Sequence, residues 1–194
     1  MGCAMCPVQQ MRVIAGAFKG RRLVTPRGPA TRPTADQVRT ALMDTLGPWL
    51  PGARVLDLFA GAGGVGLEAL SRGAAHATFV ERDGRAVAAL RENIATLGVG
   101  GATRVMRLDV GRALGRLAAE GERFAIVFLD PPYDADLTAP TLEALGGGPV
   151  TAPEALVVAQ HLTKRAPAPE IGALRAFRAR RFGETTLTFF RAGG

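Results

Sequence analysis

Lysine, tyrosine and tryptophan are scarce in this chain of 194 residues: there are two lysines, one tyrosine and one tryptophan. With only Lys19 and Lys164, arginine carries almost all of the positive charge. The sequence has no apolar run of the roughly 18 residues that a membrane span needs. Its beginning also lacks the charged start and apolar stretch of a signal peptide. We therefore expect a cytoplasmic protein without a membrane partner.

Cysteine is equally rare, and its two copies, Cys3 and Cys6, form a CxxC pair near the N-terminus. A tetrahedral zinc site needs two further ligands, and the two histidines lie far away without zinc-like spacing. A redox-active CxxC would stand between a strand and a helix rather than in an uncharged tail. We therefore expect no metal site, and we interpret residues 1–10 as a disordered extension ahead of Met11.

The net charge of +7 is unevenly distributed along the chain. Residues 12–39 hold seven basic and one acidic side chain, and residues 174–191 hold five basic and one acidic. Residues 40–173 hold twelve basic and fifteen acidic side chains, a net charge of −3. A mildly acidic middle between basic ends fits a catalytic body that holds a polyanion. Surfaces generally rich in arginine would give the same excess, so charge alone leaves both interpretations open.

From residue 53 onward, apolar strand patterns alternate with helical ones. The expected strands are 54–59, 77–81, 104–108, 124–129 and 156–160, with helices at 64–71, 85–97, 112–119 and 137–145. Two further strands, 174–182 and 185–191, are joined by Gly183 and Glu184 and form a hairpin. This order predicts a doubly wound, Rossmann-like α/β sheet, mostly parallel, with an antiparallel C-terminal edge hairpin.

A small N-terminal extension precedes this sheet. Two short strands, 12–15 and 21–24, predict a β-hairpin. A helix follows, with Thr34 as its expected N-cap and Gln37 at the capping-box spacing. We therefore divide the chain into a tail (1–10), a basic hairpin and helix (11–50), and a catalytic domain (51–194).

A glycine loop, with Gly61, Gly63 and Gly66 in the GxGxxG spacing, follows the strand that carries Asp57. The spacing alone also suits a dinucleotide-binding oxidoreductase. A carboxylate before the loop would repel a pyrophosphate, whereas it would attract a ligand that carries a cationic amine and a sulfonium. Parallel sheets bind ligands at the carboxyl ends of their strands. The residues that we expect to hold such a ligand here are Asp57, Phe59, Ala60, Gly61 and Gly63.

Two more acidic residues end the next two strands. Glu81, beside Arg82, can accept hydrogen bonds from both hydroxyls of a ribose. Asp109, beside Val110, could accept a hydrogen from an adenine amino group or could be the N-cap of the following helix. The sequence leaves these two roles for Asp109 open.

The motif Asp130-Pro131-Pro132-Tyr133 directly follows the apolar strand 124–129. An exocyclic amino nitrogen of a base is a poor nucleophile because its lone pair is delocalised into the ring. The Asp130 carboxylate and the Pro131 carbonyl are two acceptors for its hydrogens, and Pro132 stiffens the backbone. Tyr133 offers a ring on which an extruded base can rest. The motif predicts a site for methyl transfer to an amino nitrogen, by positioning and electrostatics.

Together with the glycine loop and Glu81, this motif resembles that of class I methyltransferases acting on amino groups. More narrowly, residues 11–191 resemble the RsmD-like family of 16S rRNA (guanine-N2)-methyltransferases. The stretches that carry this resemblance are 11–16, 19–23, 32–39, 66–73 and 181–185. The sequence departs from the family at Thr40 and Gln160, where relatives usually have glutamate.

The resemblance implies methylation of guanine 966 at N2, with S-adenosylmethionine as cofactor and S-adenosylhomocysteine as co-product. It also implies 16S rRNA within an assembling small subunit as partner, and we expect a monomer. The basic residues that match the family, expected to hold phosphates, are Lys19, Arg21, Arg22, Arg32 and Arg39. Methylation of adenine N6 in DNA or of a glutamine amide, which use related motifs, are the alternative functions. An oxidoreductase or a non-catalytic RNA-binding module would leave the motif at Asp130 without a purpose.

Overall fold

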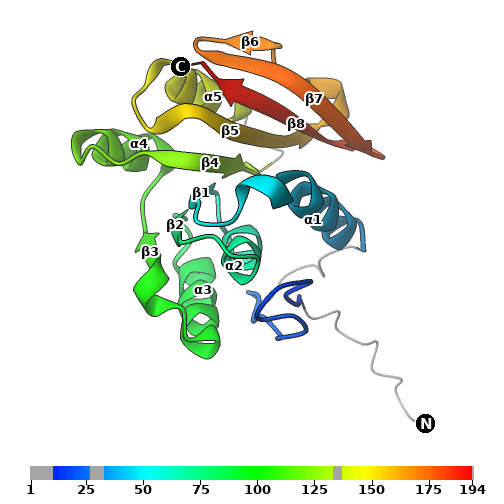
Figure 1. The fold of residues 1–194 in the computed structure, drawn as a ribbon, viewed down its shortest axis with the longest axis vertical. Coiled ribbons are helices and arrows are strands. Elements are labelled where there is room, and N and C mark those ends of the chain that lie inside the picture. Colours follow the sequence, from blue (N-terminus) through cyan, green and yellow to red (C-terminus); the bar gives the residue numbers. More distant parts are fainter. Residues whose placement is uncertain (1–10, 27–32, 133–136, 194) are drawn as a thin grey trace.

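The computed structural model of the protein describes residues 11–26, 33–132 and 137–193. Within these residues, one sheet of eight strands forms the centre of the molecule (Figure 1). Its strands are β1 (Arg54–Leu58), β2 (His76–Val80), β3 (Thr103–Met106), β4 (Phe124–Leu129), β5 (Thr151–Leu162), β6 (Glu170–Ile171), β7 (Leu174–Phe182) and β8 (Thr185–Ala192).

The strand order is β3-β2-β1-β4-β5-β8-β7-β6. The first five of these strands run parallel, while β8 is antiparallel to both β5 and β7. The chain moves outward from β1 to β3 and then returns to β4 on the other side of β1, which makes the boundary of β1 and β4 the switch point. The predicted doubly wound, mostly parallel sheet with an antiparallel C-terminal hairpin is confirmed.

Helices cover both faces of the sheet. One face carries α1 (Pro33–Leu46), α2 (Gly64–Ser71) and α3 (Gly84–Leu97), and the other carries α4 (Val110–Ala119) and α5 (Thr138–Gly147). Short 3-10 turns occur at η1 (Gly47–Trp49), η2 (Gly100–Ala102) and η3 (Thr163–Arg165). No helix within the described residues is both long and apolar enough to cross a membrane.

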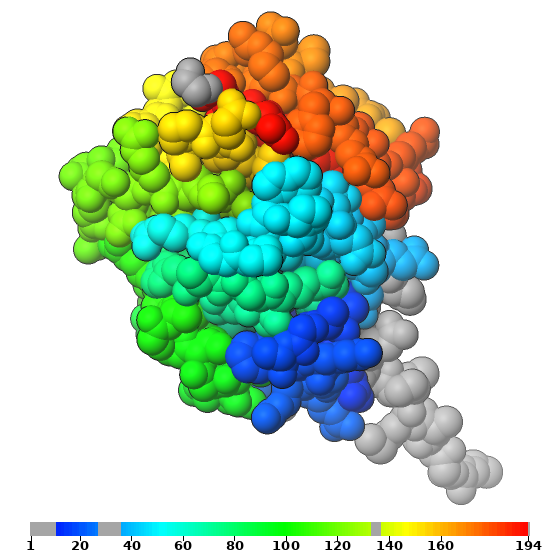
Figure 2. All heavy atoms as spheres, viewed as in Figure 1, coloured from blue at the N-terminus to red at the C-terminus, as the bar shows by residue number. Residues whose placement is uncertain are grey.

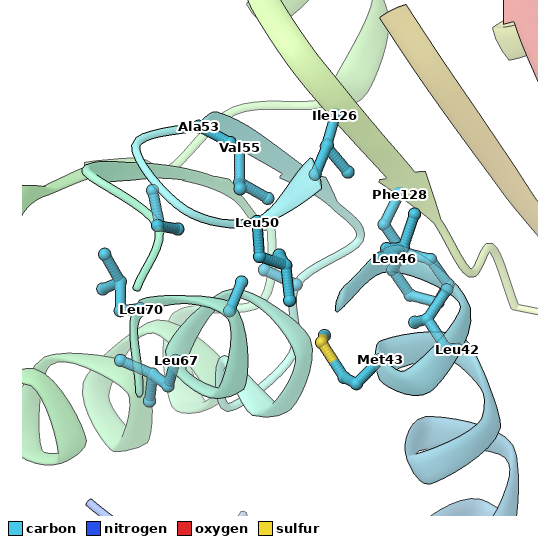
Figure 3. Packing of buried hydrophobic residues seen from close by; sticks show 14 of the residues in the cluster. Leu42, Met43, Leu46, Leu50, Ala53, Val55, Leu67, Leu70, Ile126 and Phe128 are labelled. Atoms are coloured by element: carbon cyan, nitrogen blue, oxygen red, sulfur yellow. The ribbon is translucent and has the colours of Figure 1, made fainter. Parts of the chain in front are cut away.

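Two apolar clusters hold these layers together, because alternate residues of a strand point to opposite faces. Val55 and Ile126 pack under α1 and α2, as Figure 3 shows, together with Met43 of α1. Their chain neighbours Leu56 and Val127 face the other cluster, which α4 and α5 cover. Each core strand is therefore buried on both sides, as its nearly continuous apolar sequence predicts.

The predicted N-terminal hairpin is reduced to one antiparallel bridge, between Arg12 and Arg22. Backbone hydrogen bonds do join the two arms, for example from the amide of Val13 to the carbonyl of Arg21 at 3.0 Å. The ladder ends there because the next amides, those of Ile14 and Ala15, donate to a side chain of α2 instead. The prediction of two extended strands, 12–15 and 21–24, is therefore wrong, and a single bridge stands in their place.

From residue 54 onward the predicted boundaries lie within two residues of the observed ones, except at the start of β5. Strand β5 begins at Thr151, five residues before the predicted position 156. A register shift against β4 lies between Phe124 and Ile126, and Glu154 has a left-handed φ of 59°. Such an irregularity interrupts the period-two pattern on which strand prediction depends. The two-residue β6 was not predicted.

Candidate active site

The acidic residues at the carboxyl ends of β1, β2 and β4 meet at one edge of the sheet. Because β1 pairs in parallel with both β2 and β4, its end at Leu58 lies level with Val80 and Leu129. Asp57 and Asp130 consequently lie close enough for the charge of one to raise the pKa of the other. The predicted clustering of side chains at this edge is therefore present in the structure.

Hydrogen bonds donated by its backbone amides tie the glycine loop to the end of β2 and to Glu81, which follows it. The amide of Ala60 donates to the carbonyl of Val80 at 3.0 Å, and that of Gly61 donates to Glu81 Oε2 at 2.9 Å. Phe59 has a left-handed φ of 62°, which costs conformational energy for a residue with a Cβ. Strain of this kind is held in place by surrounding contacts and is common where a backbone approaches a ligand.

Asp57 lies beneath this loop and is only 1% exposed. Its Oδ2 accepts a hydrogen bond of 2.9 Å from the amide of Gly66, in the first turn of α2. Burial raises the pKa of Asp57 to about 7, against the opposing effect of this hydrogen bond, and the charges of Asp130 and Glu81 raise it further. A positive charge nearby would favour the ionised form of this carboxyl.

Gly66 is required at this point for steric reasons. A Cβ on Gly66 would lie 2.3 Å from Cε1 of Phe79, a buried side chain of β2. This close approach packs α2 directly against the sheet and brings the Gly66 amide to Asp57. The third glycine of the GxGxxG spacing thus has a structural purpose that does not depend on any ligand.

A cavity of about 250 Å³ opens beside the loop, between the ends of β1 to β3 and the helices α4 and α5. Its walls are mainly apolar, with Val80, Leu108 and Leu114 among them. Six residues named from the sequence line it, namely Phe59, Glu81, Arg82, Asp109, Val110 and Pro132. Asp57, Ala60, Gly61 and Gly63 lie in or beneath the loop and are not part of this lining.

Both carboxylates of the cavity also have roles in the backbone. Glu81 accepts a hydrogen bond from Gly61 and one of 2.8 Å from the amide of Asp83. Two oxygens provide about four acceptor sites, so Glu81 can still accept ribose hydroxyls. Asp109 is the N-cap of α4, where its Oδ1 accepts from the amide of Arg112 at 2.9 Å. Of the two roles that the sequence left open for Asp109, helix capping is present in the structure. The capping residue still lines the cavity.

The far wall of the cavity consists of residues that the sequence did not single out. Leu137, Pro140, Thr141 and Ala144 belong to the start of α5 or precede it. No local motif marks them, because they reach the cavity only through the packing of α5 on the sheet. The sequence pointed to these residues as part of the cavity in one way only, through their position shortly after the motif at Asp130.

Asp130 directly follows β4, and its two prolines differ in exposure: Pro131 is buried, whereas Pro132 is exposed and lines the cavity. Asp130 is itself partly exposed, but it lies deep among protein atoms, and this burial raises its pKa to about 7. Tyr133 lies outside the described residues. Among the described residues, no group of three or more His, Cys, Asp or Glu side chains could hold a metal ion.

The basic residues expected to contact RNA do not all lie in one environment. Lys19, Arg21 and Arg22 are exposed, and none of them forms a salt bridge with a described residue. Arg32 lies outside the described residues. Arg39 is only 6% exposed, and its Nη2 donates to the carbonyl of Arg12 at 2.6 Å. Because it is buried and bonded internally, Arg39 is not part of the exposed basic surface.

Three buried polar residues fasten the N-terminal segment 11–26 to the catalytic body. The carboxylate of Glu68 accepts the amides of Ile14 and Ala15 at 2.7 and 2.9 Å. Ser71 accepts the amide of Phe18, and Asn93 binds both backbone groups of Val24 and the carbonyl of Ala62 in the glycine loop. Figure 2 shows this segment in blue, bordering the teal and green surface. No sequence motif marks Asn93.

Comparison with known proteins gives this arrangement a family. Residues 11–191 match the family described as "Conserved hypothetical protein 95". "Ribosomal RNA small subunit methyltransferase D" of Escherichia coli K12 is 43% identical over 148 residues, which is 76% of this chain and 73% of that protein. The Bacillus subtilis protein YlbH is 38% identical over 185 residues, or 95% and 100% of the two chains.

Solved structures agree with this assignment. A hypothetical protein of Thermus thermophilus superposes with a TM-score of 0.79 at 36% identity, over 92% of this chain and 97% of that one. RsmC, a T. thermophilus 16S rRNA N2 methyltransferase solved with AdoMet and guanosine, superposes with a TM-score of 0.68 at 21% identity. The match covers 86% of this chain and 44% of that one. At that identity the second likeness indicates the class I methyltransferase fold alone. The sequence match over nearly the whole described chain, with the same fold, makes this protein a member of the RsmD-like methyltransferase family.

Proposed function

We propose that this protein transfers a methyl group from S-adenosylmethionine to the exocyclic N2 amino group of a guanine in small-subunit ribosomal RNA. The observation that carries the proposal is Asp130-Pro131-Pro132 at the end of β4, with Pro132 lining the cavity that Glu81 and Asp109 border. Relatives named as small-subunit rRNA methyltransferases support the class of substrate. By the family resemblance, the nucleotide is guanine 966.

The cavity suits the nucleoside part of S-adenosylmethionine. Its volume of about 250 Å³ and its apolar walls favour a flat base such as adenine. The amino group of that adenine would lie within reach of Asp109 at the cavity wall. Glu81 would accept the ribose hydroxyls and Arg82 would lie beside them. The loop from Phe59 to Gly63 would lie against the amino-acid part, with the carboxyl of Asp57 beneath it. A cationic ligand suits this site because buried carboxyls with raised pKa values gain most from a nearby positive charge.

When bound, the cofactor supplies a methyl group already activated on a sulfonium, so the protein has to orient the acceptor nitrogen. We propose that the Asp130 carboxylate and the Pro131 carbonyl accept the two hydrogens of the amino group. These hydrogen bonds direct the nitrogen lone pair toward the methyl group. As the nitrogen–carbon bond forms and the carbon–sulfur bond breaks, one proton leaves the nitrogen. Because its pKa is about 7, Asp130 can take up this proton and release it to water at neutral pH.

The remaining parts of the proposal concern the partner. Exposed Lys19, Arg21 and Arg22 would contact phosphates and position the RNA without reading its sequence, and Arg32 would join them. Residues 11–50 would thus be the RNA-contacting part and residues 51–194 the catalytic domain. We further propose a cytoplasmic monomer that needs no metal and acts on an assembling small subunit. Tyr133 would support the extruded base.

The test is incubation of the protein with labelled S-adenosylmethionine and small subunits from cells that lack the modification. We expect label on N2 of one guanine of 16S rRNA. Asp130→Ala should abolish transfer while cofactor binding persists, and Arg123→Ala, at the opposite end of β4, serves as the control variant. Equal labelling of duplex DNA would contradict the RNA substrate and favour adenine N6. Label on protein would favour the glutamine amide.

A further inference from the structure

Strand β7 carries a row of arginines that no part of the proposed site uses. It holds no acidic residue, and its basic side chains are Arg175, Arg178, Arg180 and Arg181. Arg178 is exposed, and its side chain forms no hydrogen bond or ion pair with any described residue. Arg181 is also exposed, and only its Nε is occupied, by the carbonyl of Gly183 at 2.9 Å. Arg175 pairs with Glu170 of β6, whereas Arg178 and Arg181 carry positive charge that no described acidic side chain pairs with.

The outer edge of β7 is open over most of its length. Within the described residues, β6 pairs with it only at Leu174 and Arg175, and the amide of Ala176 donates to the carbonyl of Pro169. From Phe177 to Phe182 no described strand covers the outer backbone. Arg178 and Arg181 lie three residues apart in regular register, so their side chains leave opposite faces of the strand and flank this open edge on both sides.

The register of the sheet brings this edge to the active-site side. Leu129, just before Asp130, is level with Ala159 of β5, which is level with Thr188 of β8 and Ala179 of β7. In Figure 1 the arrowheads of β4 and β7 point to the same side of the sheet. Three strand spacings separate them, roughly 14 Å at the usual spacing of about 4.8 Å. A few nucleotides of single-stranded RNA span such a distance.

An exposed aromatic ring lies on the same strand. Phe177 is 48% exposed, and the guanidinium of Arg191 lies over its ring at 5.6 Å from the centroid. The ring also contacts the buried Phe189, with 6.3 Å between the centroids, which holds it in place. Single-stranded nucleic acids bind to surfaces that combine positive charge along the backbone with aromatic rings on which bases stack. Phe177 and its arginine neighbours provide both.

We propose that the outer edge of β7, defined by Phe177, Arg178 and Arg181, is a second RNA-binding surface that holds single-stranded rRNA next to the target guanine. This inference rests on the proposed function for the identity of the RNA. Charge favours RNA over a protein strand as the occupant, because β7 has no acidic residue and its exposed Arg178 and Arg181 have no acidic partner among the described residues. The edge of β7 would hold the nucleotides that flank the target guanine. The N-terminal segment 11–26 would contact a different part of the RNA.

The test compares two double variants that remove equal charge. Arg178→Ala/Arg181→Ala alters the surface, and Arg91→Ala/Arg123→Ala removes two exposed arginines of α3 and of the start of β4 that have no described partner. Binding of a single-stranded 16S rRNA fragment is measured by fluorescence anisotropy over a range of salt concentrations. Two lost phosphate contacts should reduce the slope of log K against log salt by about 1.4. The control variant should keep the wild-type slope.

A second measurement addresses the ring. Phe177→Leu keeps an apolar side chain against Phe189 but removes the stacking surface, and we expect RNA affinity to fall at least about fivefold. Cofactor binding by all of these variants should equal that of the wild type, since none of the residues lines the cavity.

The outcomes separate this inference from the proposed function. If the wild type labels the guanine and both double variants bind RNA with the same salt slope, the proposed RNA-binding surface on β7 is refuted and the proposed methyltransferase function is retained. Self-association of the β7 variant at unchanged RNA affinity would mean that the arginines only protect an open strand edge. Weaker binding to assembling subunits, with unchanged binding to naked RNA, would identify a protein partner and overturn the inference. If the wild type neither binds nor labels small-subunit RNA, both proposals fail.

Discussion

Replacing Glu68 by alanine should release the N-terminal segment from the catalytic body. Glu68 is fully buried in α2, and its two oxygens accept the amides of Ile14 and Ala15 and the Nε of Arg72 at 2.7 to 2.9 Å. Alanine leaves all three donors without an acceptor. A buried donor that loses its partner costs about 1–3 kcal/mol. If the N-terminal segment stayed in place, all three donors would pay this cost, and the loss of folding free energy would be largest.

The segment can instead move into water, which limits the loss. It would then expose Val13 and Leu23, which are 2% and 3% exposed, at about 1.5–3 kcal/mol for each side chain. The second route therefore sets the upper limit of the loss, and removing one partner of a buried ion pair typically costs about 3–5 kcal/mol. We therefore expect Glu68→Ala to lower the free energy of unfolding by about 3–5 kcal/mol, a large part of the stability of a domain of this size.

Urea denaturation measures this loss, and amide hydrogen exchange at positions 14 and 15 reports where it arises. Glu68→Gln retains one acceptor oxygen and should lose less than Glu68→Ala. Glu143→Ala, at an exposed position of α5, should change stability by no more than about 0.5 kcal/mol. A loss below about 1 kcal/mol for Glu68→Ala, with amides 14 and 15 still protected, would refute the reasoning.

Three further predictions concern the site. Asn93→Ala should cost about 2–3 kcal/mol, since it removes hydrogen bonds to two backbone segments; unchanged stability in urea would contradict this. Gly66→Ala should cost about 1–3 kcal/mol through overpacking against Phe79, and a crystal structure with both residues unshifted would speak against it. Because burial raises the pKa values of Asp57 and Asp130 to about 7, the folded state binds more protons than the unfolded state between about pH 4 and 7. The ligand-free protein should thus lose stability as pH rises through this range, and Asp57→Asn should flatten the dependence; equal slopes would exclude Asp57 as its source.

The sequence by itself determined the alternation of elements and the edge at which the site forms. Strand β4 has the predicted bounds, because an uninterrupted apolar run ended by Asp130 is a local signal that tertiary contacts do not change. Asp57 and Glu81 could be assigned to the same edge without coordinates, since successive parallel strands present their carboxyl ends together. The resemblance then supplied the family, which the comparisons confirmed.

Only the tertiary structure decided which charged and polar residues remain available at the surface. Arg39 matched a basic motif in sequence, yet it is buried and bonded to the carbonyl of Arg12. Asn93 carried no motif, yet it joins the glycine loop to Val24, 69 residues away. Such pairings depend on how distant segments pack, and no periodicity records them.

The same holds for the surface along β7. Its arginines were visible in the sequence only as a basic stretch near the C-terminus. Their place level with Asp130 follows from the insertion of β8 between β5 and β7, which local patterns do not encode. Local propensity therefore defined the elements and the strand ends, whereas strand order and packing defined the walls of the cavity and the exposed charges around it.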